Sequence, residues 1–170
     1  MSDAESFRSL RDLFRYNGWA NARVFDYCRN LDASLLGEAA PGTNGSLEET
    51  LKHLIGVEAA FLTMVQGHAL ESRGSVESFM AHDLAWFADQ VAPLTDGFLA
   101  ILANPSDGIF DREIKVPWFS FRVTAHDGLL QVLSHSAQHR AQVFSVLGSK
   151  GHDVPGLDYA RMVGEAQKPG

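Results

Sequence analysis

Residues 124–147 read TAHDGLLQVLSHSAQHRAQVFSVL and predict one long helix. Thr124 and Asp127, three residues apart, form a capping-type start, in which side chains satisfy free N–H groups of the first turn. Two glycines soon after the stretch predict where the helix ends. The stretch also carries two histidines one helical turn apart, so it bears on both the fold and the chemistry of the chain.

Three further helices are predicted from apolar residues that recur at spacings of three and four. The first runs over residues 5–31, the second over 46–66 and the third over 78–102. Pro93 lies within the third pattern and is expected to kink or bend that helix. The chain therefore contains four long helical patterns.

The connections between these patterns complete the predicted architecture. Residues 33–45 form a connection long enough to cross an end of a bundle. A turn signal at 104–108 is followed by strand-like residues over 109–123, which predict a short hairpin or an irregular insert before the last helix. The tail has few strong patterns. We expect a single all-α domain over residues 1–170, a four-helix bundle whose long connections allow a topology other than up-down-up-down.

Composition and charge narrow the class of protein. The chain has 170 residues, is 45% hydrophobic and carries a formal charge of -7, with 14 scattered basic residues. This acidic balance disfavours nucleic acid as a partner. Neither a secretory signal nor a membrane-spanning apolar stretch is visible, so we expect no membrane partner and a cytoplasmic location. The single cysteine, Cys28, cannot form an internal disulfide and is best interpreted as a small buried hydrophobic residue.

The histidine spacing predicts a metal site. His135 and His139 lie one turn apart on one helix face, where their rings can converge on one ion. The ion would need a further ligand from a facing helix, and His53, which has apolar neighbours in the second helix, is the best candidate. Alternatively, the pair arises by chance among seven histidines and His53 is an ordinary core residue. The other histidines are expected mostly at the surface, at positions 68, 82, 126 and 152.

Several polar residues are candidates for orienting the histidine rings or lining the pocket. Gln131, Gln138 and Gln142 lie three or four residues from a histidine of the pair, and their amides could hold imidazole N–H groups or bound water. They could equally belong to a solvated face. Glu49 lies one turn before the histidine of the second helix, although a capping box with Ser46 is its simpler role.

Four segments carry a family resemblance that spans nearly the whole chain. They are YNGWAN at 16–21, SLEETLKHLIGVE at 46–58, HSAQHRAQV at 135–143 and VPGLDY at 154–159. In their order and spacing they resemble the motifs of the DinB/YfiT-like family of metalloenzymes. Ala141 stands where that family usually has glycine. Because alanine favours helix, we expect no loss of the site.

The resemblance implies a fold and a set of ligands. It implies a four-helix bundle of non-simple topology that frequently dimerises, so a homodimer is expected. It also implies that His53, His135 and His139 bind zinc, nickel or another divalent ion. Asn17 and Asn21, four residues apart on the first helix, are expected to line or brace the pocket, or to pack as buried polar residues.

Three neutral imidazoles would leave a coordination position open, as catalytic zinc sites do. An ion held in this way can lower the pKa of bound water or of a thiol. Because the resemblance favours the thiol, the first hypothesis is a metal-dependent enzyme for thiol S-transfer or isomerisation of a small-molecule substrate. A low-molecular-weight thiol would be the cosubstrate, in stress response or detoxification. The alternatives are a metal-dependent hydrolase that uses bound hydroxide, a non-catalytic metal-binding stress-response protein, and a bundle without metal.

Overall fold

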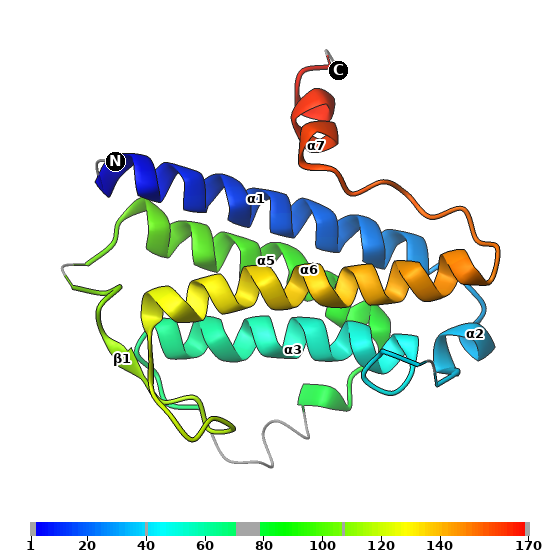
Figure 1. Cartoon of the computed structure of the whole chain (residues 1–170), viewed down its shortest axis with the longest axis horizontal. Coiled ribbons are helices and arrows are strands. Elements are labelled where there is room, and N and C mark those ends of the chain that lie inside the picture. The colour runs from blue at the N-terminus through cyan, green and yellow to red at the C-terminus, as the bar shows by residue number, and fades with distance from the viewer. Residues whose placement is uncertain (1–2, 40, 71–78, 107, 169–170) are drawn as a thin grey trace.

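The computed structural model describes residues 3–39, 41–70, 79–106 and 108–168. It is mostly helical, and four long helices lie side by side (Figure 1). This confirms the predicted all-α fold. The elements in chain order are α1 (Asp3–Cys28), α2 (Ala33–Gly37), α3 (Leu47–Val65), α5 (Leu84–Ala103), β1 (Glu113–Ile114), β2 (Val123–Thr124), α6 (Ala125–Ser149) and α7 (Tyr159–Ala166).

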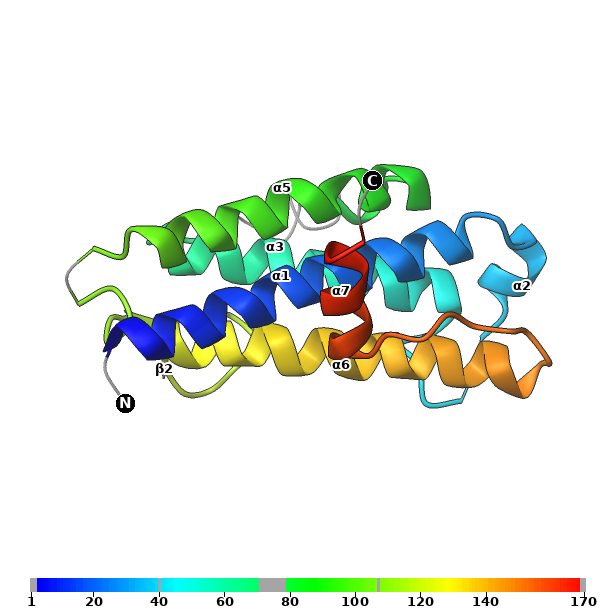
Figure 2. The ribbon, with the colours of Figure 1, turned by 90° about the horizontal axis from the view of Figure 1, so that it is seen from above.

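The four long helices form a bundle of non-simple topology. α1 packs against α5 and α6, and α3 packs against the same two helices, so α1 and α3 occupy opposite corners. The colours in Figures 1 and 2 show that α3 and α5 run in the same direction, whereas α1 and α6 run in the opposite direction. The chain therefore crosses the bundle diagonally between α1 and α3, and this arrangement places α3 beside α6.

Local capping signals position the ends of the helices. Ser46 and Glu49 form the predicted capping box of α3, and Thr124 and Asp127 form that of α6. In each box the side chains satisfy N–H groups that the first turn leaves free. α3 ends just before Gly67, whose φ of 94° lies in the left-handed region that favours glycine. These two helices hold all three candidate ligands.

The third predicted helix differs from the structure at its start. Its predicted first residue, Ser78, lies outside the described residues, and α5 begins at Leu84. The Asp83 side chain caps this start by accepting a hydrogen bond from the Trp86 N–H group at 2.8 Å. Pro93 lies inside α5, which continues beyond it to Ala103.

In the described part of the chain, two short helices lie where the sequence predicted none. α2 lies within the predicted connection 33–45, and burial of Leu36 outweighs the loop-like composition there. α7 lies in the tail, has no buried residue, and is held by Glu165, which accepts hydrogen bonds from Trp19 and Arg23 of α1. The boundaries also shift slightly, because α1 ends at residue 28 instead of 31 and α6 ends at 149 instead of 147.

The predicted insert is a short hairpin. β1 and β2 pair in antiparallel fashion, with Glu113 opposite Thr124 and Ile114 opposite Val123. Ile114 is buried against the bundle core, which anchors the hairpin beside the start of α6. Within the described ranges, no helix combines the length and the apolar composition that crossing a membrane requires.

Cys28 and most of the histidines lie where the sequence predicted. Cys28 is buried in the core. Burial raises the pKa of its thiol from 9.0 to about 12. His68, His82 and His126 are exposed, whereas His152 is half-buried.

Candidate metal centre

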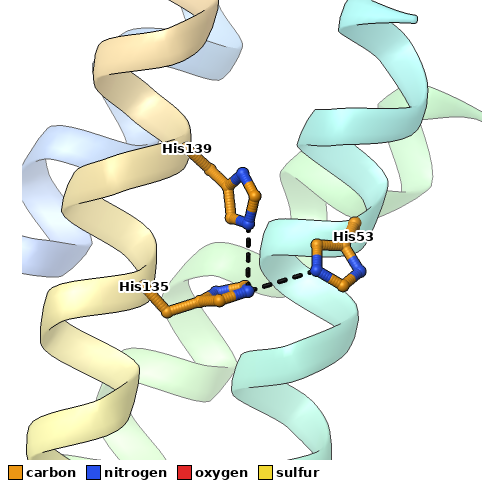
Figure 3. A group of neighbouring side chains, drawn as sticks. All are labelled: His53, His135 and His139. Atoms are coloured by element: carbon orange, nitrogen blue, oxygen red, sulfur yellow. Dashed lines mark hydrogen bonds between the residues drawn. The ribbon is translucent and has the colours of Figure 1, made fainter. Parts of the chain in front are cut away.

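Three histidine side chains converge between α3 and α6 (Figure 3). The Nε2 atom of His135 lies 3.1 Å from that of His53 and 3.0 Å from that of His139. The ring centroids lie between 4.2 and 5.0 Å apart. The structure therefore brings together the three histidines that the sequence singled out.

The rotation of α3 directs His53 toward α6. Leu51, Leu54 and Ile55 are fully buried and fix the core-facing side of α3. His53 lies at the border of this apolar face and is half-buried, because neighbouring positions on a helix point about 100° apart. α6 packs directly against α3, so His135 and His139 meet His53 across the interface.

A hydrogen bond to Gln142 fixes which ring nitrogen of His139 carries the proton. Its Nδ1 atom lies 2.6 Å from Oε1 of Gln142, and an amide oxygen can only accept a hydrogen bond. Nδ1 of His139 therefore carries the proton, and its Nε2 presents a lone pair to the other rings. Fixing a ring in this manner is typical of histidines that bind metals.

Hydrogen bonds alone do not satisfy the three facing nitrogens. The Nε2 atom of His135 faces two other ring nitrogens, and with neutral rings and a lone pair on His139, one contact at most is a hydrogen bond. The remaining contact then has no proton directed along it. A cation between the rings would be bonded by all three lone pairs, so this donor set fits a metal ion.

All three imidazoles are held in their neutral form. Burial, together with the charges of His139 and His53, lowers the pKa of His135 to about 3. Burial also lowers the pKa of His53 and of His139, although the hydrogen bond to Gln142 opposes the effect at His139. Neutral imidazole is the form that binds metal ions, so these groups need lose no proton at pH 7.

A shallow opening of about 410 Å³ lies beside the cluster. Gln142 connects the two, because it lines the opening and also accepts the hydrogen bond from His139. None of the described residues that line the opening is charged. The lining residues are Pro41, Gly42, Gln138, Ala141, Gln142, Ser145 and Val146.

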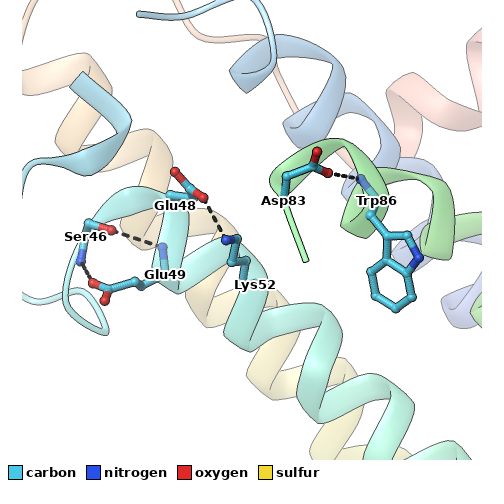
Figure 4. Close-up of polar contacts among 6 residues, drawn as sticks. All are labelled: Ser46, Glu48, Glu49, Lys52, Asp83 and Trp86. Carbon is cyan, nitrogen blue, oxygen red and sulfur yellow. Dashed lines mark hydrogen bonds and ion pairs between the residues drawn. The ribbon is translucent and has the colours of Figure 1, made fainter. Parts of the chain in front are cut away.

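The other polar candidates lie at different distances from the cluster. Gln138 is exposed and lines the opening, whereas Gln131 is half-buried one turn before His135. Glu49 is directed to the start of its own helix, where its Oε2 accepts a hydrogen bond from the Ser46 N–H group at 2.7 Å (Figure 4). This hydrogen bond and that of the Ser46 hydroxyl lower the pKa of Glu49. In this structure Glu49 therefore acts as a capping residue.

Asn17 and Asn21 belong to a buried polar network that the sequence did not reveal. Oε1 of Glu58 accepts hydrogen bonds from the side-chain amides of Asn17 at 2.7 Å and Asn21 at 2.8 Å. It also accepts one from the Ser136 hydroxyl at 2.6 Å. The amide oxygens of the two asparagines accept hydrogen bonds from Nη1 of Arg140, at 2.6 and 2.7 Å. We call these five buried residues the Glu58 network.

The network joins two opposite buried charges through two amides. Burial raises the pKa of Glu58, while its hydrogen bonds and the positive charge of Arg140 oppose that rise. Glu58 and Arg140 are only 2% and 3% exposed, so each charge depends on the other for compensation. One signal in the sequence could have revealed the network, because Glu58 lies in register with the apolar positions Ile55 and Phe61.

Comparisons with known proteins agree with this fold. A model of the DinB family matches residues 1–168. No curated protein matches the chain. The fold is similar to the crystal structure of a DinB-like protein, YjoA, from Bacillus subtilis, with a TM-score of 0.61 and 21% sequence identity over 86% of this chain and 96% of that chain. Because the family model spans nearly its full length, this chain belongs to the DinB family.

Proposed function

We propose that this protein is a divalent-metal-dependent enzyme in which His53, His135 and His139 hold the ion. The observation that carries the proposal is the convergence of three Nε2 atoms, one of them on a ring whose other nitrogen is fixed by Gln142. A bound divalent ion supplies a Lewis acid that lowers the pKa of a bound water or thiol.

The donor set supports zinc or nickel as the ion. Imidazole nitrogens suit zinc, copper, iron and nickel, whereas calcium and magnesium prefer oxygen ligands. Three protein ligands leave a position for substrate, as in catalytic zinc sites. His53 and His135 are only half-buried, which would allow a small molecule to reach that position.

The residues around the cluster suggest how a substrate binds. The opening beside His139 has a neutral lining, with amide and hydroxyl groups from Gln138, Gln142 and Ser145 next to apolar side chains. Such a lining suits an uncharged part of a small molecule that can form hydrogen bonds. We place the substrate there, next to the proposed ion.

The proposed reaction is S-transfer from a low-molecular-weight thiol, and its support is the family resemblance. The thiol sulfur forms a bond to an electrophilic carbon, and the leaving group departs with its electron pair. The thiol loses its proton to solvent or to the leaving group, so the reaction needs no oxidant or reductant. An isomerisation would use the same thiol addition, followed by its reversal.

The test compares thiol consumption by three proteins loaded with zinc or nickel. Wild type and His126→Ala should consume a thiol in the presence of electrophiles, because His126 is exposed on the same helix and lies far from the cluster. His139→Ala should lose this activity. Metal-dependent ester or amide cleavage without a thiol would indicate the hydrolase instead. Stoichiometric metal without turnover would indicate a non-catalytic metal-binding protein.

A further inference from the structure

Two members of the Glu58 network directly follow two proposed ligands in the sequence. Ser136 follows His135, and Arg140 follows His139. Successive side chains on a helix point about 100° apart, so the network residues face inward while the histidines face α3. The orientation of α6 about its axis therefore sets the directions of the network side chains and of the histidine side chains together.

We propose that the Glu58 network positions His135 and His139 by fixing the rotation of α6. Glu58 lies on α3, the helix that also carries His53. Oε1 of Glu58 accepts a hydrogen bond from the Ser136 hydroxyl at 2.6 Å. The network thus joins the two helices that hold the ligands. The inference rests on the proposed function where the test measures metal binding. Where the test measures the histidine rings of the metal-free protein, it rests on the ring geometry alone.

The network restrains rotation more tightly than apolar packing does. Apolar contacts adapt to small rotations because they have no preferred direction. The five hydrogen bonds of the network have donor–acceptor distances of 2.6 to 2.8 Å. Hydrogen bonds lose strength steeply when they are misaligned. Turning α6 would also leave two buried charges poorly compensated, which is unfavourable.

α1 contributes to the site through the same network, although it carries no proposed ligand. Asn17 and Asn21 each donate a hydrogen bond to Glu58 and accept one from Arg140, so they connect α3 to α6. Both asparagines are almost fully buried. They are positioning residues, because they act on the histidines through the helix backbone.

The experiment compares two network variants with a core variant of the same helix. Ser136→Ala and Asn21→Ala each remove one donor to Glu58, whereas Leu147→Ala removes buried apolar atoms two turns beyond His139. The readouts are cobalt(II) affinity against a competing chelator, the visible spectrum of the bound cobalt, and the imidazole ring resonances of the metal-free protein. Melting temperatures rank the loss of stability in each variant.

We expect both network variants to bind cobalt(II) about 10- to 100-fold more weakly, with an altered spectrum and shifted ring resonances. Leu147→Ala should keep the affinity, the spectrum and the ring resonances of wild type, even where its melting temperature falls further. Unchanged values in the folded network variants would overturn the inference. Equal losses in Leu147→Ala would also overturn it, because they would show a general effect of stability.

Failure of the proposed function would be seen separately. If wild type binds neither cobalt, zinc nor nickel, the proposed function fails, and the ring resonances of the metal-free protein alone decide the positioning role. Shifted resonances in the network variants would support it, and unshifted ones would overturn it. If Asn21→Ala does not fold, Ser136→Ala decides, because it removes a single hydroxyl group.

Discussion

Replacing Glu58 by glutamine should destabilise the fold by about 3 kcal/mol. The change keeps the side-chain shape and an oxygen that can accept hydrogen bonds from Asn17, Asn21 and Ser136. It removes the negative charge and leaves the buried cation of Arg140 uncompensated. Removing one partner of a buried ion pair costs about 3–5 kcal/mol. We take the lower end because the acceptor remains and because amides separate the two charges.

The loss is measured by urea unfolding of the metal-free protein, followed by circular dichroism. In a chain of this size, 3 kcal/mol corresponds to a fall in melting temperature of about 6–12 °C. The urea dependence of the unfolding free energy should stay unchanged, since the surface exposed on unfolding is the same. A loss below about 1 kcal/mol would refute the view that Glu58 is ionised and compensates Arg140.

Two further variants make this measurement specific. Glu48→Gln removes a carboxylate one turn from Lys52, at a partly exposed ion pair (Figure 4), and should cost less than about 1 kcal/mol. The double variant Glu58→Gln with Arg140→Met removes both buried charges, and its loss should be smaller than the sum of the single losses by at least about 1 kcal/mol. Additive losses would show that the two charges are not coupled.

Further predictions follow from close contacts and buried groups. Gly18→Ala should destabilise the fold by about 1 kcal/mol in thermal melts, because the added methyl would lie 2.7 Å from Cγ2 of Thr95. Gly148→Ala should stabilise the fold by up to about 1 kcal/mol, because the added methyl would meet no described atom within 4 Å; a stabilising Gly18→Ala with a destabilising Gly148→Ala would contradict this packing. Glu165→Ala should speed hydrogen exchange in α7 with little change in global stability, so unchanged exchange would contradict the docking by that carboxylate. Cys28, with its pKa raised to about 12, stays neutral in the folded state while the unfolded thiol ionises above pH 9. Between pH 8 and 10, the free energy of unfolding of wild type should therefore fall by about 1 kcal/mol more than that of Cys28→Ala. The same pH dependence of that free energy in both proteins would contradict this.

Local signals in the sequence predicted the long helices and the histidine pair. Capping boxes at Ser46 and Thr124 depend on residues three positions apart, so they can be read from the sequence directly. The pair His135 and His139 depends only on the helical repeat. The prediction of His53 as the third ligand depended on which helices face each other, and the family resemblance supported it.

The features that the sequence missed depend on contacts between distant residues. α7 is held by a hydrogen bond from Trp19 to Glu165, and these residues are 146 positions apart. The hydrogen bond between Ser136 and Glu58 spans 78 positions, so the order of the residues does not reveal it. The metal, the thiol and the homodimer stay predictions, because each concerns a partner that this chain alone does not contain.

The metal content of the purified protein tests the central claim most directly. Wild type and His126→Ala are incubated with zinc or nickel, dialysed against buffer without metal, and analysed by mass spectrometry beside His139→Ala. The three-histidine site predicts about one ion per chain in wild type and in His126→Ala, and a large loss in His139→Ala. Equal metal content in all three proteins, or none in wild type, would contradict it.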